Sequence, residues 1–177
     1  MINTSNILDG SLLILFRVIL FTYSVWIVVI DHERTNGLNY QKYTIWGELS
    51  TCISLFLLLV CSILKFAKDV LRIDSQLDKI ENSLYKWTTF FYQWALLCEL
   101  TLCFLFWAWI WCLKTDVNIM TWEQIGIKIH WDLIGDIGNY NHSVPLLLLL
   151  IDFPVNNIIF SRKILYVAFV INTLYIF

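Results

Sequence analysis

Three polar side chains near the starts of two apolar stretches have the types needed for nucleophilic chemistry. Thr44 and Glu48 lie one helical turn apart at the start of the stretch 43–64, and His142 opens the stretch 142–160. A hydroxyl beside an imidazole is the minimal nucleophile and base pair for acyl transfer. A nearby carboxylate can orient the imidazole. We therefore predict Thr44 as nucleophile, His142 as general base and Glu48 as a possible orienting group.

Thr44 and His142 each have a structural explanation as well. A threonine at the start of a helix often caps the free backbone amides there. His142 lies between Asn141 and Ser143, so it could belong to a polar cluster at a helix start on the membrane surface. Both explanations stay open at the level of the sequence.

Three further ionisable residues, Arg17, Glu99 and Asp152, lie inside apolar stretches. Burying such groups within a membrane is costly unless they pair with each other or line a protected interior. An ion pair of Arg17 with Asp152 or with Glu99 would lower that cost. We predict an interhelical charge network, and a polar path through the membrane is the alternative.

The composition indicates an integral membrane protein. Of the 177 residues, 59% are apolar and only 15% are charged, unlike in a soluble domain. The apolar residues form long blocks rather than amphipathic stripes, which is typical of helices surrounded by lipid. A net charge of −2 offers no basic face for nucleic acid. The predicted partners are membrane lipids, and helices of other chains in the bilayer as a possibility.

The apolar blocks predict an all-α, polytopic transmembrane helix bundle in a single domain. A block of about 20 apolar residues can cross the hydrocarbon layer. We expect four full spans, with Pro154 kinking the fourth, and a partial fifth. The segment 120–140 mixes isoleucines with charged residues and tryptophans, so we expect it to lie along the membrane surface. The expected spans cover residues 11–30, 43–64, 87–113, 142–160 and 164–177.

Lysine and arginine in the connectors predict the orientation. The connectors on the side of the N-terminus carry more of these residues than the connectors on the other side. Because basic loops stay in the cytosol, the N-terminus should be cytosolic, in the endoplasmic reticulum or the plasma membrane. The second and fourth spans then start on the same, non-cytosolic side. This places Thr44 and His142 at similar depth.

The cysteines predict no metal site. All five lie inside apolar blocks, and no CxxC or Cys/His loop spacing occurs. We expect small packing residues rather than zinc ligands or a disulfide framework. No cofactor-binding motif occurs either, so we expect no cofactor.

Two runs of residues resemble the androgen-induced / androgen-dependent TFPI-regulating protein family. Residues 42–49, KYTIWGEL, are similar to the start of the second helix of that family. Residues 142–152, HSVPLLLLLID, are similar to the family segment that begins with His-Thr-Thr-Val-Leu and closes in Leu-Ile-Glu. Ser161-Arg162 matches a Ser-Arg before the fifth helix. The resemblance covers about residues 38–177.

The resemblance implies a six-span membrane protein with both ends in the cytosol. It also implies hydrolysis of fatty acid esters of hydroxy fatty acids by a threonine and a histidine, with His142 as base. A match without gaps places Ile45 at the nucleophile position and Thr44 one residue earlier, about 100° away around a helix. No sixth helix follows in this sequence, so we expect it to be the N-terminal portion of a longer protein.

These observations lead to one preferred function and two alternatives. The preferred function is membrane hydrolysis of a lipid ester through a covalent acyl-threonine. The first alternative is a non-catalytic membrane protein, either a structural subunit of a larger complex or an inactive member of the family. The second is a transporter whose polar path includes the buried ionisable residues.

Overall fold

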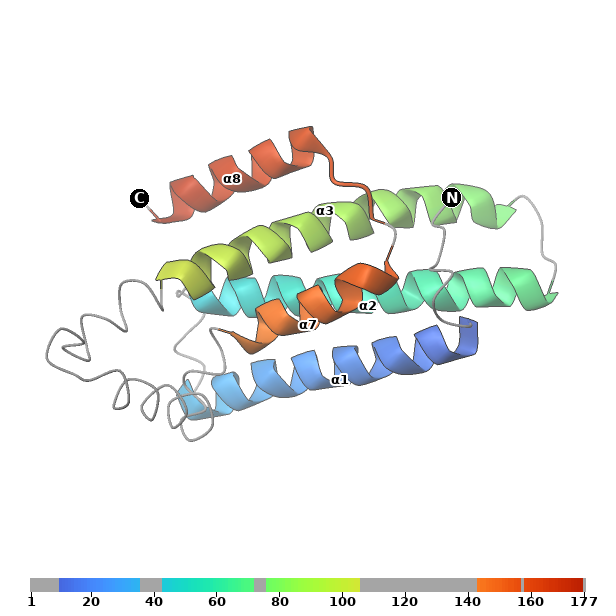
Figure 1. Ribbon diagram of the computed structural model, residues 1–177, viewed down its shortest axis with the longest axis horizontal. Helices are drawn as coiled ribbons and strands as arrows, with labels where there is room; N and C mark the ends of the chain where they lie inside the picture. The colour runs from blue at the N-terminus through green and yellow to red at the C-terminus, as the bar shows by residue number, and fades with distance from the viewer. Residues whose placement is uncertain (1–9, 36–42, 72–75, 106–142, 157, 177) are drawn as a thin grey trace, which may run out of the picture.

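The computed structural model describes residues 10–35, 43–71, 76–105, 143–156 and 158–176, and these residues are helical almost throughout. This confirms the all-α fold class for the described part of the chain. It contains five α-helices and one 3-10 helix (Figure 1): α1 Gly10–Thr35, α2 Tyr43–Leu71, α3 Gln76–Leu105, α7 Val144–Asp152, η4 Phe153–Val155 and α8 Arg162–Ile176.

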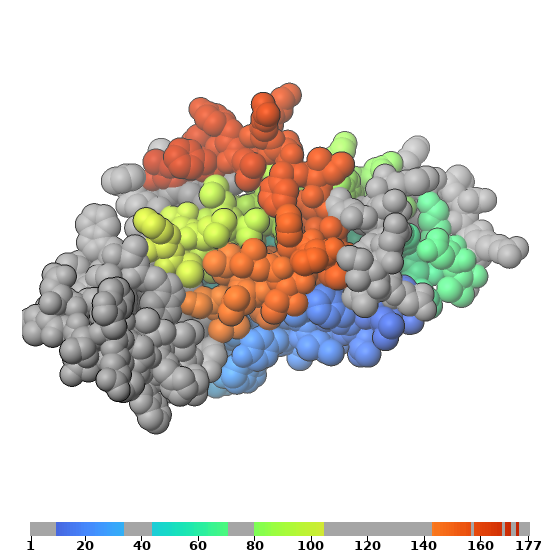
Figure 2. All heavy atoms as spheres, in the orientation of Figure 1, coloured from blue at the N-terminus to red at the C-terminus, as the bar shows by residue number. Residues whose placement is uncertain are grey.

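The three long helices run side by side in alternating directions, with α2 between α1 and α3 (Figure 1). Helix α7 packs against all three of them, whereas α8 lies on α3. In Figure 2, the orange atoms of α7 lie between the blue atoms of α1 and the yellow-green atoms of α3. The short helix α7 therefore joins the long helices on one face of the bundle.

Two of the long helices have the dimensions of membrane spans. Residues Gly10–Glu33 and Thr44–Val70 are long and apolar enough to cross a membrane, as judged by length and composition. Only 28% of the apolar window in α1 is buried inside the molecule, and 44% of the window in α2. Most of the apolar surface of these two helices therefore faces outward.

The fourth apolar stretch differs from the prediction. We expected one kinked span over residues 142–160, but the α-helix ends at Asp152 and one 3-10 turn follows. At Asn156 the backbone is extended, with φ −105° and ψ 152°. Figure 1 shows that the chain then crosses to α8, which runs back beside α3 in the direction opposite to α7. The stretch is therefore a short helix followed by an extended segment, and not a continuous span.

Two residues explain this break. Pro154 has no backbone N–H to continue the helical ladder, and its ring clashes with the carbonyl of the preceding turn. The side chain of Asn156 accepts a hydrogen bond from the Ile158 amide at 3.2 Å, a local turn that competes with helix. The backbone N–H of Asn156 still donates a hydrogen bond to the Asp152 backbone carbonyl at 3.1 Å. The helix is therefore closed within one turn of the proline.

The remaining predicted elements can be compared with the structure only within the described residues. Helix α3 begins at Gln76, earlier than the expected start at residue 87. The expected end of that span and the expected surface segment 120–140 lie outside the described residues. Helix α8 begins at Arg162, close to the expected start at residue 164.

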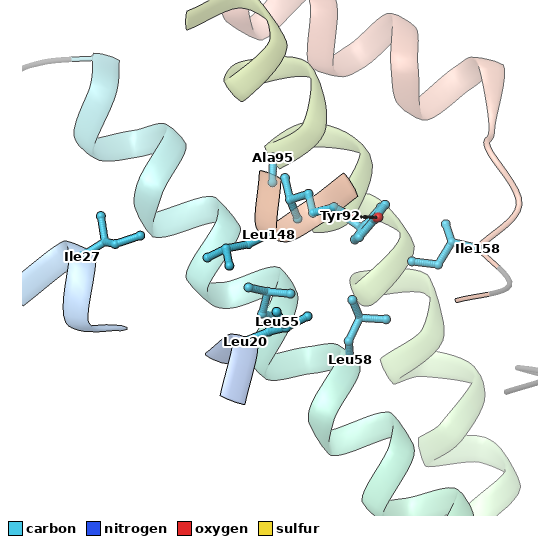
Figure 3. Close-up of a cluster of buried hydrophobic side chains, with 9 residues drawn as sticks. Leu20, Ile27, Leu55, Leu58, Tyr92, Ala95, Leu148 and Ile158 are labelled. Carbon is cyan, nitrogen blue, oxygen red and sulfur yellow. Dashed lines mark hydrogen bonds between the residues drawn. The ribbon is translucent and has the colours of Figure 1, made fainter. Parts of the chain in front are cut away.

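The hydrophobic core lies where α7 meets the three long helices (Figure 3). Each of the four helices contributes to it, and Ile158 closes it from the segment that follows the helix break. Figure 3 shows these side chains meeting in one cluster: Leu20, Ile27, Leu55, Leu58, Tyr92, Ala95, Leu148 and Ile158. The unlabelled ninth member is Leu149, which is fully buried.

Helix α7 has one buried face and one outward face, although its sequence is apolar all round. Leu148 and Leu149 are buried, whereas Leu147, Leu150 and Ile151 are between 44% and 50% exposed. Adjacent leucines of the same run therefore have different environments. This gives a matched pair of substitutions that tests the packing of α7.

Leu149→Ala should destabilise the protein by about 2–5 kcal/mol, because it leaves a cavity in a fully packed site. Leu150→Ala changes the same chemical group on the outward face and should shift stability by no more than about 0.5 kcal/mol. Thermal unfolding of both variants in one detergent measures the difference. Equal losses of stability in the two variants would contradict the described packing of α7.

Candidate functional site

The interior of the bundle contains two groups of polar side chains at different positions along its axis. We call the first the central cluster; it lies where α7 ends and consists of Arg17, Ser62, Tyr92, Asp152 and Asn156. We call the second the mouth cluster; it lies where α2 begins and α3 ends and consists of Thr44, Glu48, Thr51 and Glu99. The two clusters differ in how their charges are satisfied.

The central cluster is built on one buried ion pair. Arg17 Nε donates to Asp152 Oδ1 at 3.0 Å, and both side chains are almost completely buried. The other end of the guanidinium donates to the Leu58 carbonyl at 3.2 Å and to the Ser62 hydroxyl. Arg17 therefore pairs with Asp152 and not with Glu99, and it ties α1 to both α2 and α7.

The second oxygen of Asp152 and the broken end of α7 are satisfied as well. Asn156 Nδ2 donates to Asp152 Oδ2 at 2.9 Å. From α3, the Tyr92 hydroxyl donates to the Leu149 carbonyl at 2.8 Å, and Gln93 Nε2 donates to the Ile159 carbonyl at 3.2 Å. Both carboxylate oxygens of Asp152 are thus paired. The central cluster has the arrangement of a structural network that holds the helix break in place.

Asp152→Asn should destabilise the protein by about 3–5 kcal/mol, because the Arg17 charge then stays buried without a counter-charge. Adding Arg17→Met removes that charge, and an amide at position 152 can still accept from Asn156. We therefore expect the double variant to be more stable than Asp152→Asn alone. Thermal unfolding of the two single variants and the double variant tests this. Additive losses would contradict a direct ion pair.

The mouth cluster lies on one face of α2. Thr44, Glu48 and Thr51 follow each other at spacings of four and three residues, which places them on the same side of a helix. Glu48 and Thr51 are buried and Thr44 is half-buried. The Thr51 hydroxyl donates to Glu99 Oε1 on α3 at 3.3 Å. This face of α2 is therefore directed toward Glu99.

Gly47 allows α3 to approach α2 closely at this point. A Cβ atom on Gly47 would lie 2.8 Å from Glu99 Oε1 and 2.7 Å from Leu102 Cδ1. Real Cβ atoms do not approach other heavy atoms so closely, so a side chain here would displace the Glu99 carboxyl. The absence of a side chain at Gly47 therefore allows the Glu99 carboxyl to lie against the backbone of α2.

The carboxyl groups of the mouth cluster are not satisfied by hydrogen bonds. Within the described residues, neither oxygen of Glu48 and only one oxygen of Glu99 has a hydrogen-bond partner. Asp31, at the end of α1, acts electrostatically on Glu48, as does Glu99. The guanidinium of Arg17 is engaged by Asp152 at the centre of the bundle. Three acidic side chains, Asp31, Glu48 and Glu99, therefore act on one another at the mouth.

The predicted base, His142, lies outside the described residues, and so does any contact it makes with Thr44. The next residue, Ser143, is described, and it lies within hydrogen-bonding reach of Cys103 on α3. Cys103 follows Glu99 by one helical turn. Helix α7 therefore starts at the end of the bundle that carries Thr44 and Glu48 (Figure 1).

The neighbour of Thr44 has a different environment. Ile45, which the family resemblance matches to the nucleophile position, is only 2% exposed and faces the packed interior. Thr44 is the second residue of α2, on the face that carries Glu48. Of these two residues, only Thr44 has a hydroxyl group, and this hydroxyl belongs to the mouth cluster.

The sequence analysis did not single out Gly47, Thr51 or Asn156. Thr51 and Gly47 lie close to Glu48 on the same helix, so the residues around this buried acid could have been examined as possible partners. Asn156 follows Asp152 by four residues and could have been expected to pair with it on a helix. Tyr92 and Gln93 lie in an aromatic run, and no local pattern identifies them as partners of α7.

No group of three or more histidine, cysteine, aspartate or glutamate side chains that could hold a metal ion occurs among the described residues. No protein-family model, curated protein or solved structure matches this chain. The family resemblance therefore stays a prediction from the residues quoted above, and function must be argued from the site.

Proposed function

We propose that this chain is an integral, multi-pass membrane hydrolase of lipid esters, of the type formed by fatty acids and hydroxy fatty acids. The membrane setting is supported by the distribution of side chains. Large apolar residues such as Leu15, Ile19 and Phe104 are 57–70% exposed, whereas Arg17 and Glu99 are almost completely buried. This is the reverse of a soluble protein, and a lipid surround accounts for it.

The observation that carries the proposal is the position of Thr44 on the Glu48 face of α2, at the end of the bundle where α7 starts. A half-buried hydroxyl at a helix start is accessible to a lipid ester that enters sideways from the bilayer. His142 precedes the start of α7 at Val144 by two residues in the sequence.

The proposed reaction proceeds in two steps. Thr44 Oγ attacks the ester carbonyl carbon while its proton passes to His142, and the imidazolium then protonates the departing hydroxy fatty acid. Water, deprotonated by His142, attacks the acyl-threonine, releases the fatty acid and restores the Thr44 hydroxyl. Glu48 is proposed to orient the imidazole. The membrane would be the endoplasmic reticulum or the plasma membrane, with the N-terminus in the cytosol.

A fluorophosphonate probe tests this proposal on the whole chain in detergent or nanodiscs. We expect covalent labelling at Thr44, complete loss of labelling in Thr44→Ala, and at least a 100-fold slower labelling rate in His142→Ala. Thr173→Ala is the matched control, because its hydroxyl bonds to a carbonyl of α8 on the exposed surface. Labelling that persists in Thr44→Ala, or that is absent from the intact chain, would contradict the proposal.

One observation favours a non-catalytic membrane protein as the second candidate. If the nucleophile position of the resembling family falls on Ile45, a buried aliphatic side chain occupies it, and the bundle keeps its shape without the chemistry. Such a protein would ignore the probe and purify together with its partners. A transporter would instead lose flux in Asp152→Asn and keep the labelling pattern of the intact chain.

A further inference from the structure

The mouth cluster contains three buried carboxylate oxygens that lack hydrogen-bond partners within the described residues: both oxygens of Glu48 and Oε2 of Glu99. Glu48 is 2% exposed and Glu99 is fully buried. Burying one polar group without a partner is costly, and burying a charged carboxylate without a counter-charge costs much more. Native proteins retain such groups where a ligand, an ion or a reaction uses them.

The two carboxyl groups belong to one site and are not isolated residues. Glu99 acts electrostatically on Glu48 across the interface of α2 and α3. Thr51 lies one turn beyond Glu48 on the same face and already binds Glu99. Gly47 provides the space that brings the Glu99 carboxyl against α2. Helices α2 and α3 therefore bring the oxygen atoms of Glu48, Thr51 and Glu99 into one cradle at their interface.

The acidic composition of this cluster favours a cation. Glu99 and Asp31 both act electrostatically on Glu48. The central cluster shows how the same bundle satisfies a single buried carboxylate, with an arginine and an asparagine. The described part of the mouth cluster contains no such basic side chain. Two carboxyl groups and a hydroxyl form an oxygen ligand set that matches a hard divalent cation.

We propose that Glu48 and Glu99, supported by the Thr51 hydroxyl, bind a divalent cation with oxygen preference, of which Ca²⁺ is the best fit. Calcium accepts carboxylates as single or double ligands in a flexible geometry and completes its shell with water. Magnesium requires stricter octahedral geometry and retains its water more strongly. The half-buried Thr44 end of the cradle provides the route for the ion and its water.

This inference shares Glu48 with the proposed hydrolase but does not rest on it. All of its ligands lie on α2 and α3, and its test measures ion binding rather than ester cleavage. The sequence analysis expected no metal, because it searched for cysteine and histidine spacings. A pair of glutamates on two different helices has no sequence spacing that such a search can find.

The experiment is calcium titration of the intact chain, purified in detergent with chelator, followed by thermal unfolding. We expect calcium at about 100 times its dissociation constant to raise Tm by about 5–10 °C. Equilibrium dialysis with ⁴⁵Ca²⁺ should show saturable binding to the same preparation. Magnesium and sodium at equal concentrations should have a much smaller effect.

Three variants decide whether the site is the one described. Glu48→Gln and Glu99→Gln keep the side-chain shape and remove one charge, so each should fold and lose the calcium shift and the saturable binding. Gly47→Ala retains both acids but displaces Glu99, so it should weaken binding by at least about tenfold. Glu81→Gln, which alters an acid paired with Lys68 at 3.4 Å elsewhere on α3, should keep the full shift.

The outcomes separate the cation site from the hydrolase. Thr44→Ala should abolish probe labelling and keep the calcium shift. The absence of any calcium shift in the intact chain, or an equal shift in Glu48→Gln and Glu99→Gln, would overturn the proposal. Stabilisation by sodium alone would overturn the assignment to a divalent ion.

Discussion

The ion pair between Arg17 and Asp152 is the interaction on which the arrangement of the bundle depends. A guanidinium two turns into an apolar helix has no access to water, so the fold must bring an acceptor to it. Asp152 supplies that acceptor at the end of α7, and Leu58 and Ser62 complete the shell from α2. Because the charge is fixed on α1, the depth at which α7 ends is fixed with it.

The break after Asp152 follows from the same requirement. The end of a helix leaves backbone carbonyls without partners, and the surrounding apolar side chains offer no hydrogen-bond donors to satisfy them. Tyr92 and Gln93 on α3 supply side-chain donors to carbonyls on either side of the break. Asp152, Val155 and Ile158 of this segment are buried against the bundle, whereas Phe153 and Ile159 are exposed. Because α7 is short and ends at the central cluster, its N-terminal end lies at the mouth.

The sequence predicted the helical class and the burial of Arg17, Glu99 and Asp152, because these follow from local composition, but it did not predict the burial of Asp31. It did not predict that the fourth stretch breaks, although Pro154 indicated a kink. The stretch is apolar on both sides of that residue, and hydropathy alone does not distinguish a span from a half-span followed by an extended segment. The decisive hydrogen bonds come from α3, more than fifty residues away in the sequence.

The choice of partner for Arg17 could not be predicted for a similar reason. Glu99 and Asp152 are equally acidic and equally embedded in apolar sequence. Arg17 lies seven residues from the start of α1, or about 10 Å along its axis, whereas Glu99 lies near the end of α3. Since α1 and α3 start at the same end of the bundle, these two side chains are far apart. Only the packed arrangement of helices contains that information.

The two polar clusters show two different ways in which one bundle buries charge. At the centre, each oxygen of the acid has a donor and the arginine has its acceptors, so nothing remains for a ligand to bind. At the mouth, the described side chains supply one donor for four carboxylate oxygens. Stability alone would favour apolar residues in place of Glu48 and Glu99, because buried charges without partners oppose folding. Their presence beside Thr44 argues that this protein binds a ligand at the mouth and not at the centre, where the polar groups are already paired.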